Sequence, residues 1–473
     1  MSASRRRFGS TSAVLAVLAV LALVPGCAFV ATNSPTSSSC SARDAPATIN
    51  AAGQGSEEGD LVIVGRIVTM DDPPIAEALL IEAGLVTCVG TRDEVLALAG
   101  AEVQVVDIGA NVAYPGFIDA HAHWIGHRDL AKLDSAEEAM DAAVRRGWTS
   151  ISEQMVPPDQ LAELTALAED AALRLRVDAY LFLTSGDEFS RNGYADREPG
   201  PMGDRLRVQG LKIGLADGPG TGNWELADLS ETIGRANEAG WQVSVHAVST
   251  GAEDLALDAY EAALGAAGPN PVHNRIEHTT EVSDDQLARI VAMDLVTVIH
   301  PGGSAVDWAL WDEYMGLGAD HPAQQIGWLS RWRDFVEAGL HVAAATDAPW
   351  FSPDTAFTAD IGAFTEVVGR PVDQIAGGME GLGTEFPKTT VWVRDQRLTA
   401  EQGLRAVTVD AAYALRDETR RGHLSSGTLG DVTILSGDVT DATPGEIRDM
   451  QVIATIVGGV VVYCSDSNVC GQE

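Results

Sequence analysis

The sequence predicts an α/β fold in which a (β/α)8 TIM barrel is joined to a small composite β-sandwich domain built by both ends of the chain. In the middle of the chain, short apolar runs alternate with helical patterns, and eight strands separated by helices are typical of this barrel. Near both ends, short β-type runs with glycine turns replace that alternation. A doubly wound open sheet is the alternative, and it is disfavoured because no Gly-x-Gly-x-x-Gly follows the first barrel strand.

Residues 1–26 are predicted to be an export signal. Arg5–Arg7 supply positive charge, and Ala13–Val24 form an apolar stretch too short to span a bilayer comfortably. Cys27 follows at the position where bacterial lipoprotein signals end, and Ser4–Phe8 resembles a twin-arginine signal. We therefore expect a lipid-anchored Cys27, with an ordinary cleaved secretory peptide as the alternative.

The composition points to an exported protein with a solvated acidic surface. Residues 27–58 are rich in Ser, Thr, Ala and Pro, which predicts a flexible tether. The formal net charge of -37 argues against nucleic-acid binding, which needs a basic face. Cys464 and Cys470 flank a short polar loop and could pair in an oxidising compartment. We expect a membrane-anchored lipoprotein or a periplasmic or extracellular protein that meets the membrane only through its anchor. The sequence leaves oligomerisation open.

The composite β domain is expected over residues 59–114 and 418–464, with the barrel over 115–417 and a tail over 465–473. The predicted strands of the β domain are 61–64, 66–70, 78–82, 85–89, 103–106, 432–435, 452–457 and 458–463, the last two joined by a hairpin at Gly458–Gly459.

The barrel is expected to alternate strictly between strand and helix. The predicted strands are 117–120, 149–153, 176–183, 210–215, 242–248, 275–279, 296–299 and 341–345. The predicted helices are 136–146, 158–172, 224–239, 252–266, 283–293 and 323–338.

The first barrel strand ends in a histidine pair. Side chains alternate along a strand, so His121 and His123 are expected to leave its C-terminal end side by side. Imidazole is a favoured ligand for zinc and similar ions. This pair therefore predicts part of a metal site.

Other candidate ligands follow the same rule. Lys212, His246, His278 and Asp347 lie in or at the ends of the fourth, fifth, sixth and eighth predicted strands. Each alone is explained by core packing or turn capping. Together they indicate an active site, because the C-terminal ends of barrel strands converge on one face.

This order of residues resembles the amidohydrolase superfamily, and the flanking phrases are similar to its amidohydrolase-3, YtcJ-like branch. The similar phrases are 115–123, 211–213 with 217–218, 245–247, 275–278, 346–349, 398–408, 427–435 and 453–463. The resemblance covers residues 60–463. It implies a metal-bearing barrel with a β domain from both chain ends, and hydrolysis of a C–N bond in a small amide or N-formyl compound.

The resemblance also implies roles. One or two divalent ions, with zinc the expected metal, would be held by His121 and His123 on one side and by His246 and His278 on the other. Lys212 would be carboxylated into a bridge, and the alternative is an unmodified lysine beside a single ion. Asp347 would be both a ligand and the general base that serves a metal-activated hydroxide.

The substrate is less well indicated. His127, His300 and Trp308 are expected to line the pocket, with packing or loop capping as an equal alternative. The family commonly has Gln-Pro after the seventh strand, where this chain has His300 followed by proline. Glu277 has the opposite strand parity to His278, so a structural role is expected for it.

Three function classes remain. The first is hydrolysis of a C–N bond. The second is hydrolysis of ester or other C–O bonds or of C–halogen bonds, or isomerisation, on the same scaffold. The third is a non-catalytic ligand-binding lipoprotein, which Asp347 argues against because a binding module needs no general base.

Overall fold

A computed structural model describes residue 40 and residues 59–215, 223–265, 269–303, 327–349, 369–380 and 396–470. Residues 35–473 form one compact unit. The expected export signal, Cys27, the tether apart from Cys40, and Trp308 lie outside the described residues.

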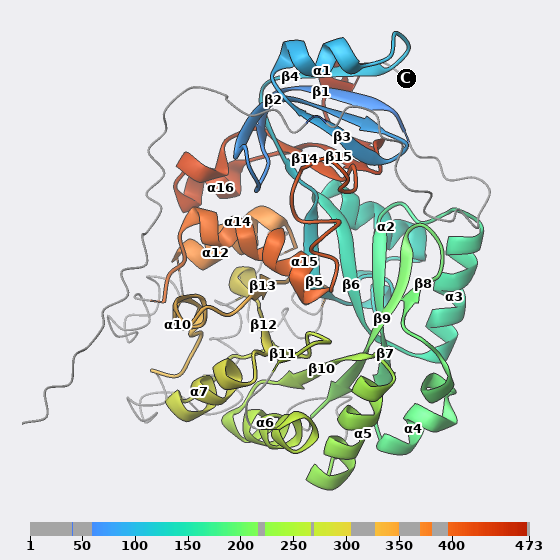
Figure 1. The fold of residues 1–473 in the computed structure, drawn as a ribbon, viewed down its shortest axis with the longest axis vertical. Coiled ribbons are helices and arrows are strands. Elements are labelled where there is room, and N and C mark those ends of the chain that lie inside the picture. Colours follow the sequence, from blue (N-terminus) through green and yellow to red (C-terminus); the bar gives the residue numbers. More distant parts are fainter. Residues whose placement is uncertain are drawn as a thin grey trace, which may run out of the picture. The chain divides into compact units, whose positions relative to one another are not determined.

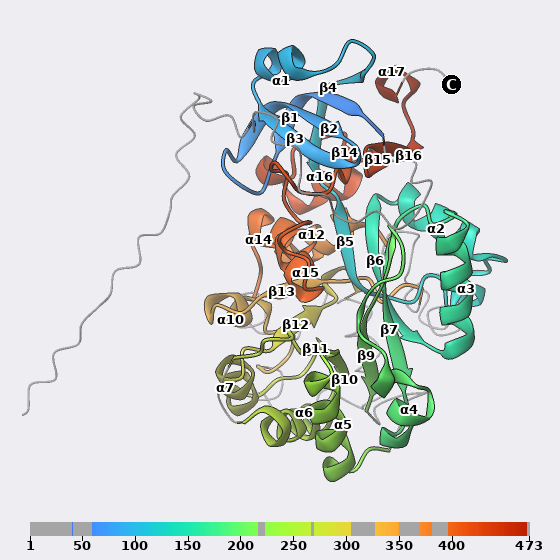
Figure 2. The same cartoon turned by 45° about the vertical axis from the view of Figure 1, so that its right-hand side comes forward.

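Eight parallel strands form the barrel, in the order β13-β12-β11-β10-β9-β7-β6-β5 (Figures 1 and 2). They are β5 (Phe117–Ala122), β6 (Trp148–Val156), β7 (Arg176–Leu183), β9 (Leu206–Gly214), β10 (Gln242–Ala247), β11 (Arg275–His278), β12 (Val296–Ile299) and β13 (Val342–Ala344). A short strand, β8 (Gly200–Pro201), pairs antiparallel with β9. Each predicted barrel strand overlaps an observed one, and the barrel prediction is confirmed.

The barrel closes beyond the ends of its first and last strands. β5 and β13 stand at the two ends of the hydrogen-bonded order. Where β5 ends, the Asp347 amide donates to the His121 carbonyl at 2.9 Å, and the His123 amide donates to the Ala348 carbonyl at 2.7 Å. The seam is therefore joined at three of the predicted site residues.

Helices follow the strands around the barrel (Figure 1). They are α2 (Ala136–Arg145), α3 (Pro158–Glu169), α4 (Gly186–Arg191), α5 (Leu226–Glu238), α6 (Thr250–Leu264), α7 (Asp284–Ala292), α10 (Trp332–Glu337), α12 (Pro371–Glu380), α14 (Ala400–Ala406) and α15 (Val409–Ala414). Ser135, Ser249, Ser283 and Thr399 cap α2, α6, α7 and α14, each accepting a hydrogen bond from a backbone amide of the first turn.

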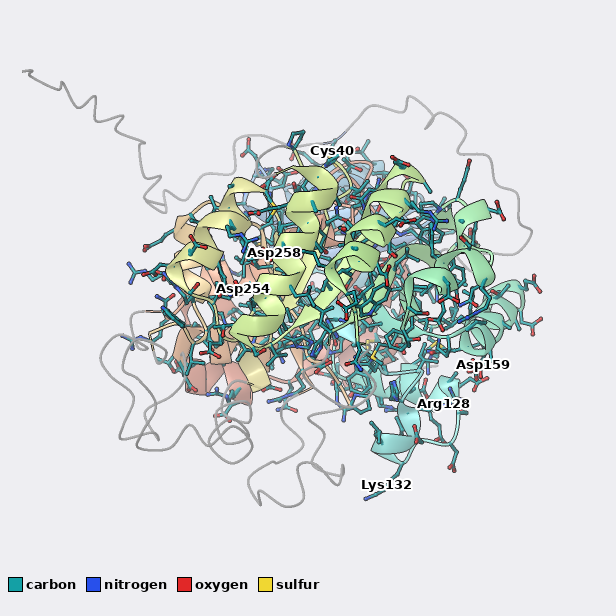
Figure 3. The ribbon with its side chains drawn as sticks, turned by 90° about the horizontal axis from the view of Figure 1, so that it is seen from below. Cys40, Arg128, Lys132, Asp159, Asp254 and Asp258 are labelled. Atoms are coloured by element: carbon teal, nitrogen blue, oxygen red, sulfur yellow. A yellow bond between two sulfur atoms is a disulfide. The ribbon has the colours of Figure 1, made fainter. Side chains whose placement is uncertain are left out.

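The acidic surface is partly organised in ion pairs between neighbouring helices. Asp254 and Asp258 are exposed on α6 (Figure 3). Arg289 of α7 lies 2.6 Å from Asp258 and 2.8 Å from Glu261. Such exposed pairs contribute little individually. They show how some of the excess negative charge is compensated locally.

The two ends of the chain build one seven-stranded mixed sheet, in the order β16-β15-β14-β4-β1-β2-β3. Its strands are β1 (Leu61–Val68), β2 (Ile75–Glu82), β3 (Leu85–Gly90), β4 (Gln104–Pro115), β14 (Val432–Leu435), β15 (Val452–Val457) and β16 (Val460–Cys464). Antiparallel pairing of β14 with β4 joins the two ends, and Ile63, Val86 and Ile434 share one core. The composite β domain is confirmed, and it takes the form of one continuous sheet rather than two separate ones.

Short elements complete the described chain. They are α1 (Arg92–Leu98), α16 (Pro444–Asp449), α17 (Ser467–Cys470) and the 3-10 turns η1 (Arg128–Ala131), η2 (Tyr194–Asp196), η3 (Pro301–Gly303) and η4 (Val439–Asp441). No helix among the described residues is both long enough and apolar enough to cross a bilayer.

Two glycines allow connections that the sequence pattern did not reveal. Gly65, with φ +144°, lies where the register of β1 shifts, so the two runs predicted there form one bulged strand. Gly116 links β4 to β5. A Cβ on Gly116 would collide with the Thr149 hydroxyl and lie 2.8 Å from Asp431 Cβ. Only glycine therefore fits this passage from the sheet into the barrel.

Two disulfides are present. Cys464 pairs with Cys470, the pairing considered from the sequence, and Cys470 is the last residue of α17. Cys40 pairs with Cys88 of β3, which the sequence did not suggest. The second disulfide attaches the chain at residue 40 directly to the composite sheet.

A buried ion-pair network connects the barrel to the C-terminal segment. Arg176 of β7 lies 2.7 Å from Asp431. Asp178, on the same strand, lies 2.6 Å from Arg207 and 2.9 Å from Arg421. Burial raises the pKa of Asp178, but the Arg207 and Arg421 guanidinium groups outweigh it and hold that pKa below its ordinary value of 3.8.

Candidate metal centre

His121, His123 and Asp347 form the centre of the candidate site. All three are buried, and one ligand atom from each lies within 4.8 Å of the others. Asp347 Oδ1 lies 3.3 Å from His121 Nε2 and 3.2 Å from His123 Nε2. The sequence predicted these residues to converge, and the structure places them together.

A bulge in β5 sets the direction of the histidine pair. The register between β5 and β6 slips between Asp119 and Ala122. Ile118, before the slip, and Ala120, within it, pack with residues of other strands, including Val298. A bulge inserts one residue and changes which side chains face inward. His121 also lies within this slip, and its ring faces Glu277 and Asp347.

The remaining predicted ligands lie around this centre. His278 and His300 form a second close group with His121. The His246 ring lies 4.4 Å from the His278 ring, measured between centroids. Lys212 of β9 is 1% exposed, and its Nζ has no hydrogen-bond partner among the described residues.

Burial keeps these groups in the forms that bind a metal. Burial lowers the pKa of His246 to about 3, with nearby Lys212 adding to the effect. Burial and the neighbouring His246 and His300 hold the pKa of His278 well below its usual range. Neutral imidazoles keep a lone pair for a cation. The pKa of Lys212 is lowered to about 8 by burial, against the opposing effect of Glu277 and Asp347.

Asp347 stays ionised. Burial raises its pKa, but the adjacent His121 and His123 imidazoles outweigh burial and hold that pKa well below 3.8. Buried neutral imidazoles around an anionic carboxylate, with a buried amine lacking a partner, fit a divalent cation.

Glu277 supports the centre, which the sequence pattern did not predict. Its Oε2 lies 2.6 Å from His121 Nδ1, and it also accepts hydrogen bonds from Ser244 and Arg275. With Nδ1 so engaged, His121 presents Nε2 to the site. His278 has φ +75°, so strand alternation fails at the end of β11 and parity did not separate the two residues. The sequence feature that could have indicated this role is the pair of charged residues Arg275 and Glu277 in a strand that is buried.

A second supporting group lies under His123. The Nδ1 atom of His123 is 3.1 Å from the backbone carbonyl oxygen of Gln154. Glu153 accepts hydrogen bonds from the Ile125 and Gly126 amides, which fixes the loop after His123. Asp119 accepts from the Thr346 amide at 2.9 Å and thereby ties β5 to the segment that carries Asp347. These contacts join residues far apart in the sequence and carry no recognisable sequence motif.

The three residues expected to line the pocket differ in where they lie. His127 is half-buried, and its ring centroid lies 5.4 Å from that of His123. His300 is buried against the metal-ligand candidates, with its ring centroid 4.7 Å from that of His278. Trp308 lies outside the described residues.

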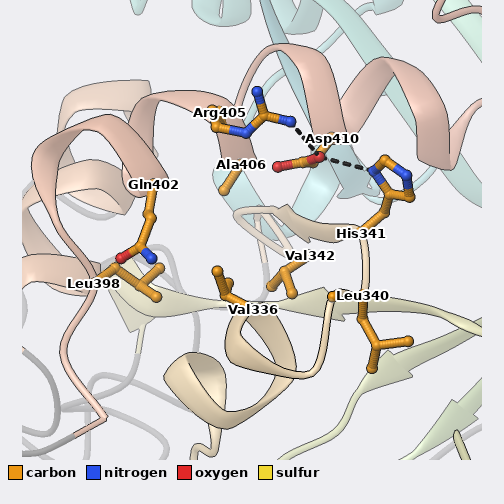
Figure 4. A pocket seen from close by; sticks show the side chains of 10 residues that line it. Val336, Leu340, His341, Val342, Leu398, Gln402, Arg405, Ala406 and Asp410 are labelled. Carbon is orange, nitrogen blue, oxygen red and sulfur yellow. Dashed lines mark hydrogen bonds and ion pairs between the residues drawn. The ribbon is translucent and has the colours of Figure 1, made fainter. Parts of the chain in front are cut away.

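A separate cavity of about 210 Å³ opens at the other end of β13 (Figure 4). His341, which precedes β13, lies 2.9 Å from Asp410, and Asp410 lies 3.2 Å from Arg405. The residues that line this cavity include none of the predicted site residues. Enzymes with this barrel use the C-terminal ends of the strands. The cavity is therefore distinct from the candidate centre.

A family model described as "Amidohydrolase family" matches residues 128–463. The chain belongs to the amidohydrolase family. The sequence resemblance to amidohydrolase family 3 is thus confirmed, and the His/Asp clusters are consistent with a metal-dependent hydrolase of the amidohydrolase superfamily.

Curated relatives are distant. The chain is 24% identical to an N-substituted formamide deformylase of Arthrobacter pascens, over 70% of this chain and 62% of that protein. It is 24% identical to YtcJ of Bacillus subtilis, over 56% of this chain and 45% of that protein. The chain thus spans less than two thirds of the length of either relative.

The fold of this amidohydrolase is similar to solved structures. An uncharacterised metal-dependent hydrolase from Pyrococcus horikoshii OT3 matches with a TM-score of 0.64 and 17% identity, covering 82% of this chain and 99% of that one. At this identity the likeness supports the fold.

Proposed function

We propose that this protein hydrolyses a C–N bond of amide or N-formyl type in a small molecule. The observation that carries the proposal is the placement of Asp347 beside His121 and His123 at the C-terminal ends of the barrel strands. The similarity to a formamide deformylase favours C–N chemistry.

Metal ligands and the base are separate parts of this mechanism. When bound, a divalent ion lowers the pKa of a coordinated water to about 7 and polarises a carbonyl oxygen. His121, His123, His246 and His278 would hold one or two such ions, and zinc is the expected metal. Asp347 would accept a proton from the attacking water and pass it to the leaving nitrogen.

We propose that Lys212 reacts with carbon dioxide to form a carbamate, releasing a proton and turning the amine into an anionic ligand. A pKa of about 8 leaves a fraction of the amine neutral, and therefore reactive, at neutral pH. An unmodified lysine beside a single ion is the alternative. Metal uptake by chelator-treated protein should then depend on added bicarbonate in the first case and be independent of it in the second.

The test of the proposed function combines metal analysis with a substrate screen. Protein purified without chelator is expected to contain at least one equivalent of a divalent metal. It should hydrolyse some member of a panel of N-formyl and N-acyl compounds and lose that activity when the metal is removed. A metal-free active protein contradicts the mechanism. Activity on esters or halogenated compounds alone replaces the C–N assignment, and binding without turnover indicates a ligand-binding lipoprotein.

We propose export with a lipid anchor at Cys27, a small-molecule substrate and no nucleic-acid partner. The two disulfides support an oxidising compartment, because such bonds are rare in the cytosol. Cys27→Ala should move the protein from the membrane fraction to the soluble fraction after cell lysis, and the matched change Cys40→Ala should not. A Cys27→Ala protein that stays in the membrane fraction places the anchor elsewhere.

A further inference from the structure

We propose that His300 is a further ligand of the metal centre and binds the ion through Nε2 beside His278. This inference rests on the proposed metal-dependent function and concerns a residue of the seventh barrel strand. The other candidate ligands lie on the first, fourth, fifth, sixth and eighth strands, in β5, β9, β10 and β11 and after β13.

The hydrogen bond of His300 fixes which nitrogen is available. Its Nδ1 lies 3.2 Å from the carbonyl oxygen of Ala345, which can only accept. Nδ1 therefore carries the hydrogen, and Nε2 carries the lone pair. This is the arrangement found for histidine ligands, whose other ring nitrogen donates to a carbonyl or a carboxylate.

The remaining nitrogen is buried and without a partner. His300 is 4% exposed, and no described residue hydrogen-bonds to its Nε2. A buried polar atom without a partner is costly, so such an atom in a native protein calls for a ligand, an ion or a water. Packing alone explains the position of the ring but leaves this cost in place.

The surroundings of His300 select a cation. One ring nitrogen of His300 lies within 4.8 Å of one ring nitrogen each of His121 and His278. The three rings gather at centroid distances of 4.7 to 5.4 Å. A cation is the ligand that can accept a lone pair from each of several converging imidazoles, and Nε2 of His300 carries such a lone pair.

The same arrangement links His300 to the centre at Asp347. His121 belongs to both close groups, and its Nδ1 is held by Glu277. Only Nε2 of His121 is therefore available to both groups, and its single lone pair can bind one ion. An ion at His121 would be shared by the two groups, with His123 and Asp347 on one side and His278 and His300 on the other.

The test is a count of imidazole ligands rather than of turnover. Wild-type protein and His300→Ala are loaded with zinc, and X-ray absorption spectra give the number of nitrogen ligands from imidazole. We expect His300→Ala to lose one imidazole per site and to bind zinc at least about tenfold more weakly in competition with a chromophoric chelator. His300→Gln keeps a similar volume and should show the same loss of imidazole.

His341→Ala is the matched control. His341 also adjoins the eighth strand and also donates through Nδ1, but it donates to Asp410 at the opposite end of the barrel. We expect the His341→Ala protein to keep the wild-type imidazole count and zinc affinity. Thermal unfolding of each metal-free variant separates a folding defect from a ligand defect.

Each outcome decides the proposal. If folded His300→Ala and His300→Gln keep the wild-type imidazole count and affinity, His300 is not a ligand, even if turnover falls. In that case the proposed function stands. If wild-type protein binds no metal, the proposed function fails first and the assignment of His300 fails with it. If neither variant folds without metal, the wild-type imidazole count decides, since a count no larger than the other histidines supply overturns the proposal.

Discussion

Asp347 has the contacts of both a ligand and a base, and a single substitution separates the two roles. Asp347→Asn keeps the shape of the side chain and removes its basicity. We expect turnover to fall by about a hundredfold or more, because a positioned general base contributes that much. Zinc content, measured on the same protein samples, should be largely retained.

Asp410→Asn is the control for that change. Asp410 also lies beside a histidine and an arginine, at the far end of the barrel. Its substitution should leave turnover close to wild type. Loss of both metal and turnover in Asp347→Asn would make Asp347 chiefly a ligand. Unchanged turnover would remove it from the mechanism.

Glu277 contacts His121 and would affect a bound metal through that ring. Glu277→Gln keeps the size of the side chain but removes the charge that orients the imidazole and that pairs with buried Arg275. Burial raises the pKa of Glu277, but Arg275 and His121 outweigh it, so the wild-type group is ionised. We expect zinc affinity to fall by about 10- to 100-fold, the usual effect of losing such a partner.

The matched change Glu337→Gln removes a carboxylate that pairs with Arg333 on the surface. It should leave zinc affinity unchanged in the same chelator competition. Equal affinities for wild type and Glu277→Gln would show that His121 needs no such support.

At the scale of the elements, strands were more predictable than their ends. The limits of β7 and β12 coincide with the predicted runs, because apolar side chains and flanking turns define a buried strand locally. The hairpin from Val457 to Val460 was likewise predicted from its two glycines. The arrangement of side chains at the strand ends depends on contacts with residues that are far away in the sequence.

The candidate site shows the same division. The convergence of His121, His123 and Asp347 followed from residue type and strand order. The position of Glu277 against His121 could not be predicted, because it depends on the positive φ of His278. The contact of His300 with Ala345, which follows the next strand, could not be predicted either. The partner of Cys88 was equally hidden, because residue 40 lies 48 positions away.

The passage between the sheet and the barrel makes a prediction about Gly116. Gly116→Ala places a Cβ against Thr149 and Asp431, and overpacking of this kind costs about 1–3 kcal/mol of unfolding free energy. Gly234→Ala is the control, since it lies in α5 with open space around it and should be neutral or slightly stabilising. Chemical denaturation of both variants checks this, and equal stabilities would show that the connection can shift.

At the scale of the whole molecule, the Asp178 network predicts how stability depends on pH. Asp178 has a folded-state pKa below 3.8, so its contribution is complete above that value and is lost as pH falls through the lowered pKa. Asp178→Asn leaves Arg207 and Arg421 without this partner and should cost about 3–5 kcal/mol near pH 7. The difference from wild type should stay constant down to about pH 5 and shrink below pH 3.8.

Denaturant unfolding at a series of pH values measures this difference. Asp187→Asn, which removes an exposed carboxylate paired with Arg191, should show no measurable change at any pH. A gap between wild type and Asp178→Asn that persists unchanged to pH 2 would mean that the ionised carboxylate is not the source of the stabilisation.

The disulfide between Cys40 and Cys88 would limit how far the protein can stand from a membrane that holds the proposed anchor. If Cys27 carries the proposed anchor, the leash from Cys27 to the disulfide at Cys40 spans 13 positions, against 32 positions to Gly59, whose amide donates to the Gly458 carbonyl. At no more than about 3.5 Å per residue, the leash reaches at most about 45 Å, against about 110 Å for the longer path. The disulfide would hold Cys88 within about 45 Å of the anchor, whereas without it the limit, then set at Gly59, would be about 110 Å.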